Sequence, residues 1–194
     1  MSVSKRSAEP GHFHAVRFYK DADSLCAIVG TFLTEGFTAS QPAVVIATPV
    51  HRTMIEECLE REGRDVGTLK RSRQLVFLDA ETLLSQFMVN GMPNPALFKG
   101  AIVPVLEKIC EGRKDCVVRA YGEMVDVLWK AGQTVPAIRL EMLWNDLART
   151  RSFSLLCGYA MGNFYKDAAV DEICAQHSHV LTEPLPGTHE VRPQ

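Results

Sequence analysis

The sequence lacks the motifs by which several large protein classes are recognised. No phosphate-binding GxxxxGK followed by Ser or Thr occurs, and neither do GxGxxG, GxSxG or HExxH. The segment after the first expected strand, residues 20–24, has no glycine and contains Asp21 and Asp23. These carboxylates would repel a phosphate group at the place where a phosphate loop would hold it. The sequence therefore argues against ATP hydrolysis.

Long hydrophobic runs and a strong charge of either sign are also missing. No apolar stretch reaches the roughly 18 residues of a membrane span, and residues 1–11 are polar, unlike a signal peptide. The formal net charge of −2 gives no electrostatic reason to bind nucleic acid. With 46% hydrophobic and 23% charged residues, the composition is that of a soluble globular domain. We therefore expect a cytoplasmic protein with no membrane contact and no direct nucleic-acid contact.

The six cysteines form no CxxC pair and show no spacing typical of a zinc ribbon. Most of them stand inside apolar segments, so we interpret all six as buried thiols in a reducing compartment. Two other roles stay open: Cys157 as an oxidant sensor whose thiolate is stabilised by Arg119, and a cysteine nucleophile that meets a histidine in space. The cysteines are Cys26, Cys58, Cys110, Cys116, Cys157 and Cys174.

Short strand-like segments alternate with helix-like segments along the chain. The strands are expected from short apolar runs, and the helices from apolar side chains spaced three and four residues apart. Such alternation predicts βαβ units, so we expect a three-layer α/β fold with a mostly parallel sheet of about five or more strands and helices on both faces. The expected strands are residues 15–19, 43–47, 75–78, 116–121 and 153–157.

Some of the expected helices and the domain limits carry specific predictions. A short helix should run through Leu83 and Met88, and Pro104 predicts a kink or a late start in the next helix. A last helix is expected over residues 170–178. The chain is expected to form one domain over residues 12–180, between a disordered leader at 1–11 and a tail at 181–194 that is rich in proline.

Polar and aromatic residues follow the expected strands, where ligands of parallel α/β sheets bind. Arg119 is suited to hold a ligand carboxylate or phosphate through two N–H bonds, with Glu123 fixing its orientation. The alternative is that these two residues brace the turn between them. Tyr19, Tyr121 and Tyr159 would line one apolar pocket, or each would cap the core separately. The expected ligand-binding residues are Tyr19, Thr48, Asp79, Arg119, Glu123 and Tyr159.

Three further patterns have both a functional and a structural explanation. Asp79 is a candidate phosphoacceptor, but the spacing of the acidic and basic partners that it would need is poor. The basic segment 70–73 suits an acidic partner, although a solvated turn is the preferred explanation at this net charge. A transition-metal site near the last helix is the third pattern, although we expect no metal. Its candidate ligands are Cys174, His177 and His179, joined by His12 or His14.

Several short segments stand in a fixed order along the chain: His14 with Tyr19, and residues 47–51, 77–80, 87–88, 91–93, 119–126, 140–145 and 153–159. Together they resemble the MEDS domain, a sensory domain named after methanogen and methylotroph proteins including the DcmR regulator. The similarity spans about residues 12–180. It implies a RecA/KaiC-like fold that has lost its phosphate loop. It also implies a sensory role in bacterial or archaeal signalling, with small hydrocarbon derivatives as ligands.

The resemblance implies a non-enzymatic signal-transduction domain that binds a small ligand at the carboxyl edge of its sheet. Such domains are commonly joined to histidine kinase or DNA-binding modules, and we expect neither after residue 180. We therefore expect the chain to relay its signal to a histidine kinase or response regulator, with a homodimer as one option and without a cofactor. The alternative is a degenerate nucleotide-binding protein that holds ATP without hydrolysing it. An enzyme with a cysteine nucleophile is the third hypothesis.

Overall fold

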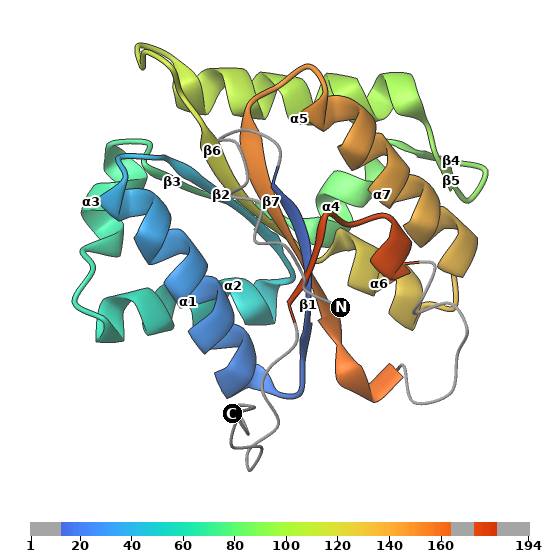
Figure 1. Ribbon diagram of the computed structural model, residues 1–194, viewed down its shortest axis with the longest axis horizontal. Helices are drawn as coiled ribbons and strands as arrows, with labels where there is room; N and C mark the ends of the chain where they lie inside the picture. The colour runs from blue at the N-terminus through green and yellow to red at the C-terminus, as the bar shows by residue number, and fades with distance from the viewer. Residues whose placement is uncertain (1–12, 164–172, 182–194) are drawn as a thin grey trace, which may run out of the picture.

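The computed structural model describes residues 13–163 and 173–181, and a parallel sheet forms its centre (Figure 1). The sheet contains β1 (His14–Tyr19), β2 (Ala43–Ala47), β3 (Leu75–Asp79), β6 (Val118–Gly122), β7 (Phe153–Ala160) and β8 (His179–Leu181). Their order is β3-β2-β6-β7-β1-β8, and every neighbouring pair is parallel. All five strands expected from the sequence are present, and no end is shifted by more than three residues.

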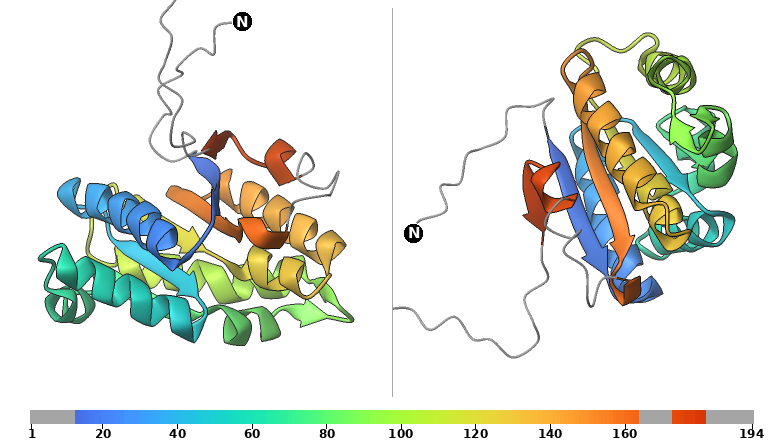
Figure 2. Two further views of the ribbon diagram at one scale, coloured as in Figure 1. Left: turned by 90° about the horizontal axis from the view of Figure 1, so that it is seen from below. Right: turned by 90° about the vertical axis from the view of Figure 1, so that its right-hand side faces the viewer.

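Helices cover both faces of the sheet and complete three layers (Figures 1 and 2). Alternate side chains of each strand pack into one of two cores, so Val45 and Tyr121 face one helical layer while Ile46 and Ala120 face the other. The expected three-layer α/β architecture is therefore confirmed. No helix of the described residues is both long and apolar enough to cross a membrane. The first layer holds α1 (Ala22–Thr38), α2 (Pro49–Arg61) and α3 (Val66–Arg71), and the second holds α4 (Ala80–Ser85), α5 (Pro95–Cys110), α6 (Met124–Lys130) and α7 (Thr134–Ala148).

Short polar side chains fix the starts of the helices that follow β1 and β3. Asp21 accepts the backbone N–H of Ser24 at 2.8 Å, and the Ser24 hydroxyl accepts the backbone N–H of Asp21, which makes a capping box on α1. Asp79 caps α4 by accepting the backbone N–H of Thr82 at 2.8 Å. At α2, by contrast, the Thr48 side chain makes no capping hydrogen bond. The free N–H groups at the start of α2 are thus left for another partner.

The segment around Met88 corrects one helix prediction. Helix α4 ends at Ser85, and Met88 begins a hairpin of β4 (Met88–Val89) and β5 (Met92–Pro93). Asn90 and Gly91 form the turn with φ angles of 49° and 76°. An Asn-Gly pair adopts this left-handed backbone readily, and two-residue hairpin turns require it. The turn preference therefore overrides the apolar periodicity that suggested a longer helix.

Three other elements differ from the expectation. Helix α5 begins at Pro95 and continues through Pro104, so a late start is wrong. Helix α3 includes part of segment 70–73, for which a solvated turn was the preferred explanation. Residues 173–175 are helical, but residues 179–181 form β8 beside β1, so the last helix does not reach residue 178. The first residues of that expected helix, the leader at 1–11 and nearly all of the tail lie outside the described residues.

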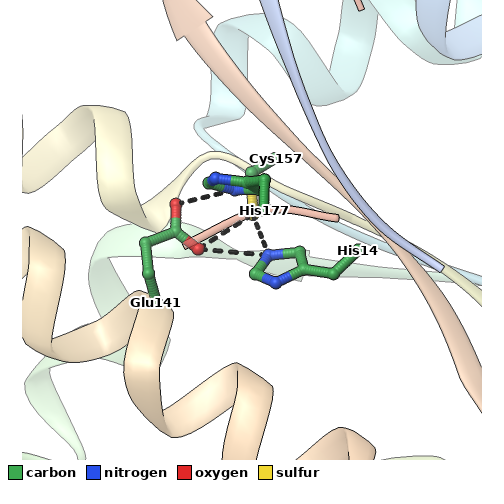
Figure 3. Close-up of side chains that lie close together, drawn as sticks. All are labelled: His14, Glu141, Cys157 and His177. Carbon is green, nitrogen blue, oxygen red and sulfur yellow. Dashed lines mark hydrogen bonds and ion pairs between the residues drawn. The ribbon is translucent and has the colours of Figure 1, made fainter. Parts of the chain in front are cut away.

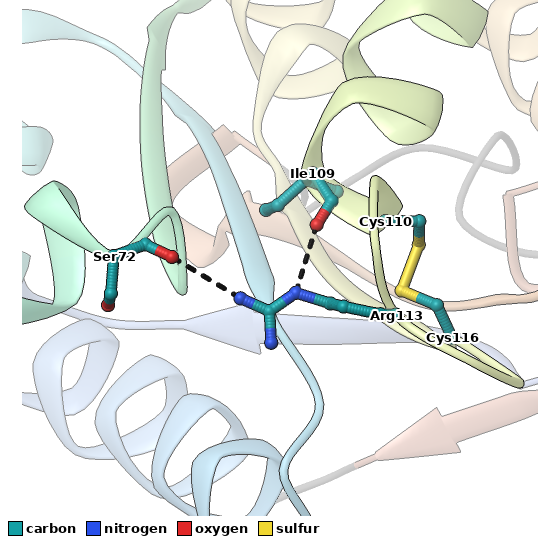
Figure 4. The surroundings of a disulfide bond; sticks show 5 residues. All are labelled: Ser72, Ile109, Cys110, Arg113 and Cys116. Carbon is teal, nitrogen blue, oxygen red and sulfur yellow. Dashed lines mark hydrogen bonds between the residues drawn. A yellow bond between two sulfur atoms is a disulfide. The ribbon is translucent and has the colours of Figure 1, made fainter.

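A disulfide joins Cys110 at the end of α5 to Cys116 ahead of β6 (Figure 4). The interpretation of all six cysteines as buried thiols is therefore wrong for these two, which are half-buried and bonded. Inside the closed loop, Arg113 donates from Nε to the Ile109 carbonyl at 3.1 Å and from Nη2 to the Ser72 carbonyl at 3.3 Å. These bonds fasten the loop to the turn after α3. Of the other cysteines, Cys26, Cys58 and Cys157 are buried and Cys174 is half-buried, and this disulfide includes none of the four.

Candidate functional site

The carboxyl ends of β1, β2, β3 and β6 meet at one edge of the sheet, where the sequence predicts a ligand site. Register places Ala47 opposite Asp79 and Ile46 opposite Gly122. Tyr19, Thr48, Asp79 and Glu123 therefore stand at or just beyond this edge, as expected. Tyr159 also lies near it, but faces the other helical layer. Arg119 lies elsewhere.

Glu123 is the centre of a hydrogen-bonded group at the carboxyl edge. The residue is only 1% exposed. Oε1 accepts the backbone N–H of Thr48 at 2.5 Å, while Oε2 lies 2.6 Å from His51 Nδ1 and accepts the Tyr121 hydroxyl at 3.2 Å. The carboxylate thus occupies the start of α2, where the helix dipole favours negative charge. Burial, and next the charge of Glu123, raise the pKa of Tyr121 well above its usual value, so Tyr121 is a donor here.

Tyr19 and Asp126 form a second polar group beside Glu123. The Tyr19 hydroxyl donates to Asp126 Oδ2 at 3.1 Å, Lys130 Nζ lies 2.6 Å from the same oxygen, and Oδ1 accepts the backbone N–H of Ala160. Burial first, and then the negative charge of Asp126, raise the pKa of Tyr19 far above its usual value. The Tyr19 ring also meets the edge of His51 at 5.9 Å between centroids. Tyr19 therefore bridges the two polar groups.

Asp79 has a structural task at the same edge. Besides capping α4, it lies 3.2 Å from Nη2 of Arg52 on α2. The hydrogen bonds from Thr82, first of all the backbone one, lower the pKa of Asp79, and Arg52 acts in the same direction. With its oxygens already used, Asp79 ties α2 to α4.

Arg119 is the second residue of β6 and pairs with Ala43, the first residue of β2, so it lies toward the amino end of the sheet. The expectation that Arg119 and Glu123 flank one turn is therefore wrong, because Arg119 lies inside β6 and the last three residues of that strand separate it from Glu123. Arg119 Nε donates to Gln41 Oε1 at 2.8 Å, and its guanidinium lies over the Phe32 ring at 4.9 Å. These contacts brace the end of α1. The same position rules out stabilisation of a Cys157 thiolate by Arg119, since Cys157 faces the opposite layer.

The three tyrosines at strand ends do not converge on one pocket. Tyr19 and Tyr121 share the α1–α2 face of the sheet, whereas Tyr159 lies in the core on the α6–α7 face. The cause is the alternation of side chains along a strand. Leu156, which pairs with Tyr121, shares its face of the sheet, and Tyr159, three residues further along β7, points to the other face. Tyr159 instead donates to Glu141 Oε1 at 2.8 Å.

Glu141 is the centre of a buried cluster on the other face of the sheet, which the sequence does not predict as a group (Figure 3). Four side chains from distant parts of the chain meet there: His14 of β1, Glu141 of α7, Cys157 of β7, and His177 just ahead of β8. One ligand-type atom of each lies within 4.8 Å of those of all the others. The side chains of Glu141 and His177 are fully buried, and His14 and Cys157 are nearly so.

The contacts inside this cluster are short. His14 Nε2 lies 3.2 Å from Glu141 Oε2 and 3.4 Å from Cys157 Sγ, and Sγ lies 3.4 Å from Glu141 Oε2. His177 Nε2 lies 3.3 Å from Glu141 Oε1, yet the two are not aligned as a hydrogen bond, so this buried nitrogen lacks a hydrogen-bond partner. The imidazole rings of His14 and His177 are 4.3 Å apart between centroids.

Burial and charge act against each other on the titrating groups of the cluster. Burial alone would raise the pKa of Glu141, but the charge of His177 nearby, together with the hydrogen bond and charge of His14, outweighs it and lowers this pKa. Burial also opposes protonation of His177, and the charge of Glu141 outweighs it and raises the pKa of His177. Burial, then the charge of Glu141, raise the pKa of Cys157 well above its usual value. Cys157 is thus a thiol that donates to a carboxylate.

The metal alternative considered from the sequence named two of these residues and two wrong ones. His14 and His177 are in the cluster, but His179 stacks on Phe13 at 4.9 Å and Cys174 is not among the four residues that meet. His12 lies outside the described residues. The other two members of the cluster, Glu141 and Cys157, lie within apolar segments of α7 and β7, and their spacing in the sequence does not distinguish them from core residues.

A cleft of about 340 Å³ opens beside this cluster. His14 lines it from β1, Asn145 and Met142 line it from α7, and Gln176 and Ser178 line it from the segment ahead of β8. His14 therefore belongs both to the cleft and to the cluster.

Comparison with protein families gives one match. The family described as MEDS: MEthanogen/methylotroph, DcmR Sensory domain matches residues 13–178, which include both polar clusters. The search of curated proteins finds no match.

Proposed function

Because the chain belongs to the MEDS family of sensory domains, we propose that it binds a small ligand and passes this state to a protein partner in a signalling pathway. The family match supports the sensory role, and the lack of any nucleotide-binding motif in the sequence agrees with it. A sensor of this kind works by binding its ligand more tightly in one conformation than in another.

We place the ligand site of this proposal at the carboxyl edge, around Tyr19, Thr48, Asp79 and Glu123, with His51 added. The observation that carries it is the Glu123–His51 pair. Nδ1 of His51 is held by Glu123 at 2.6 Å, which leaves Nε2 as the ring nitrogen for a ligand, and the side chain is 19% exposed. Asp79 shapes this edge by holding α2 and α4 together. Arg119 and Tyr159 are left out, because one lies at the amino end and the other bonds Glu141.

The partner in this proposal is a histidine kinase or response regulator of a two-component system, or a second copy of the chain. Val50 directly precedes His51 at the start of α2 and is exposed. An apolar side chain beside the ligand site suits a contact that changes when the ligand binds. A shift of α2 would then alter the surface that the partner covers.

Nucleotide binding without hydrolysis has less support than the small-ligand hypothesis. At the start of α1, where a phosphate would sit after β1, the Asp21 carboxylate already accepts the backbone N–H of Ser24. A phosphate would have to displace that carboxylate and overcome its charge. At α2 the equivalent position is filled by Glu123.

The test is a thermal-shift screen of the purified chain with small alcohols, amines and halogenated hydrocarbons, and with ATP and Mg²⁺. We expect a member of the small-molecule set to raise the melting temperature of wild type and of the control Glu60→Gln, whose side chain is exposed. The variant His51→Ala should lose this rise. An equal rise in His51→Ala would place the site elsewhere, and a rise with ATP would favour the nucleotide hypothesis.

A further inference from the structure

We propose that His14, Glu141, Cys157 and His177 bind a divalent transition-metal ion of the zinc class in a buried, four-ligand site. The two imidazoles, one carboxylate and one thiolate are the donor types that Zn²⁺ takes in proteins, and thiolate together with imidazole selects against Mg²⁺ and Ca²⁺. This site is separate from the Glu123 group, because it lies on the other face of the sheet. Figure 3 shows the four side chains turned toward one another.

The distances fit a tetrahedral ion. Bonds of roughly 2.0 to 2.3 Å from zinc to nitrogen, oxygen and sulfur place neighbouring ligand atoms roughly 3.3 to 3.8 Å apart. Three such atoms, His14 Nε2, Glu141 Oε2 and Cys157 Sγ, form a triangle with sides of 3.2, 3.4 and 3.4 Å. His177 Nε2 lies 3.3 Å from the other oxygen of Glu141, and a ligand atom of His177 lies within 4.8 Å of one from each of the other three residues. A small movement of one side chain therefore closes the tetrahedron.

The outer contacts orient both imidazoles for metal binding. Asn145 Nδ2 donates to the Gln176 carbonyl at 2.8 Å, so its Oδ1 is an acceptor and takes the Nδ1–H of His14, also at 2.8 Å. Nδ1 of His177 lies 2.8 Å from the Ile173 carbonyl, which accepts its proton. Each ring therefore carries hydrogen on Nδ1 and turns the lone pair of Nε2 toward the centre. This arrangement of outer acceptors is common around zinc-binding histidines.

Burial also favours a cation at this position. The buried nitrogen of His177 has no hydrogen-bond partner, and a metal ion would satisfy it. With a carboxylate, a thiolate and two neutral imidazoles, a divalent cation makes the group electrically neutral, whereas the ionised ligands alone would be costly to bury. One of the four residues, His14, also lines the cleft beside the cluster, so the group lies next to an opening in the protein surface.

The first experiment tests metal binding in the untagged full chain. The protein is stripped with a chelator and titrated with Co²⁺, which reports tetrahedral coordination by its visible absorption and thiolate coordination by a near-ultraviolet charge-transfer band. We expect one equivalent of Co²⁺ to produce both signals and Zn²⁺ to displace it. If wild type shows neither the absorption nor uptake of Zn²⁺, the proposal is overturned.

Variants then locate the site. Cys157→Ser should remove the charge-transfer band and lower the Zn²⁺ affinity more than roughly 100-fold, since even outer partners of metal ligands are worth roughly 10- to 100-fold. Asn145→Ala should retain the band and lose affinity within that smaller range. The control is Cys26→Ser, another buried cysteine, which lies on the opposite face of the sheet. A band that survives in Cys157→Ser, or disappears in Cys26→Ser, would show that the ligands are assigned wrongly.

Discussion

Glu123 and Glu141 are buried carboxylates on either side of the sheet, and their surroundings differ in a way that matters for function. Glu123 is held by a backbone N–H at the start of α2, an imidazole and a phenol. Those donors satisfy it fully within the protein. Glu141 also accepts a hydrogen bond from a phenol, that of Tyr159, but its other neighbours are two imidazoles and a thiol, which bind metals when deprotonated. A buried carboxylate alone therefore does not indicate a metal site, and the groups that contact it determine whether it can bind a metal.

Replacing Glu123 tests the importance of its contacts for stability. Glu123→Gln removes the charge from hydrogen bonds to Thr48, His51 and Tyr121, and one amide group cannot accept all of them. We expect the free energy of unfolding in urea to fall by about 2 kcal/mol. The exposed control Glu60→Gln should change it by less than about 0.5 kcal/mol. Equal effects of the two variants would mean that the Glu123 contacts add no net stability.

The sequence reveals the carboxyl-edge residues more readily than the Glu141 cluster, for a physical reason. Tyr19 is the last residue of one apolar strand and Glu123 directly follows another, so the strand ends predict their positions. His14 begins β1 and Cys157 lies within β7, and they meet only because register sets His14 opposite Leu155, two residues from Cys157 on the same face. Glu141 stands among the apolar side chains of α7. Register and helix packing between distant segments are not encoded in local spacing.

At the level of elements, the sequence predicts an element reliably where a clear local pattern, such as a continuous apolar run, covers its whole length. The continuous apolar run of β2 gives its limits correctly, and all five of its residues are buried. The three-residue strand β8 has no such signal, since it owes its conformation to pairing with β1. The short helix α3 is similar, because it is held by the Asp65 cap and by packing of Val66 rather than by a long periodic stripe. Short elements such as these depend on tertiary contacts, and local sequence patterns therefore do not predict them.

The cap of α4 gives a prediction with a pH dependence. Asp79→Ala should lower the free energy of unfolding by about 1 kcal/mol by removing the N-cap, whereas Asp79→Asn keeps an acceptor and loses mainly the Arg52 ion pair. The folded pKa of Asp79 is lowered, so its ionised form contributes stability above the unfolded pKa of about 3.9. That contribution is lost as the pH falls through the folded pKa. Urea unfolding should therefore show a gap between wild type and Asp79→Asn at neutral pH that closes in strong acid, and a gap independent of pH would contradict this.

The loop between α5 and β6 gives a prediction for the disulfide. Cys110 and Cys116 are six residues apart, and closing so short a loop is worth about 2 kcal/mol through the unfolded chain. We expect a phosphine reductant to lower the urea midpoint of wild type. The double variant Cys110→Ser with Cys116→Ser should start at the lower midpoint and not respond to the reductant. A wild-type midpoint that ignores the reductant would show that the bond does not stabilise the fold.

At the scale of the whole molecule, strands of one sheet contribute side chains to the polar groups at the carboxyl edge and to the Glu141 cluster. Strand β1 carries Tyr19 toward the Asp126 group and His14 toward Glu141, and β7 carries Cys157 to the same cluster. The proposed metal would join β1, β7, α7 and the segment ahead of β8, which lie far apart in the sequence. A ligand at the carboxyl edge and a metal in the core would thus act on one sheet.

Metal binding should therefore stabilise the folded chain as a unit. An ion that binds only the folded state adds about 2.7 kcal/mol when its free concentration is 100 times the Kd. For a chain of this size that corresponds to a rise of roughly 5 to 10 °C in the melting temperature of the stripped protein. Calorimetry with Zn²⁺ should show the rise in wild type and in Cys26→Ser but not in Cys157→Ser, and Mg²⁺ should produce none. Hydrogen exchange should slow mainly in β1 and residues 173–181, because His14 and His177 anchor these segments to α7. Equal stabilisation of Cys157→Ser would mean that zinc acts elsewhere on the molecule.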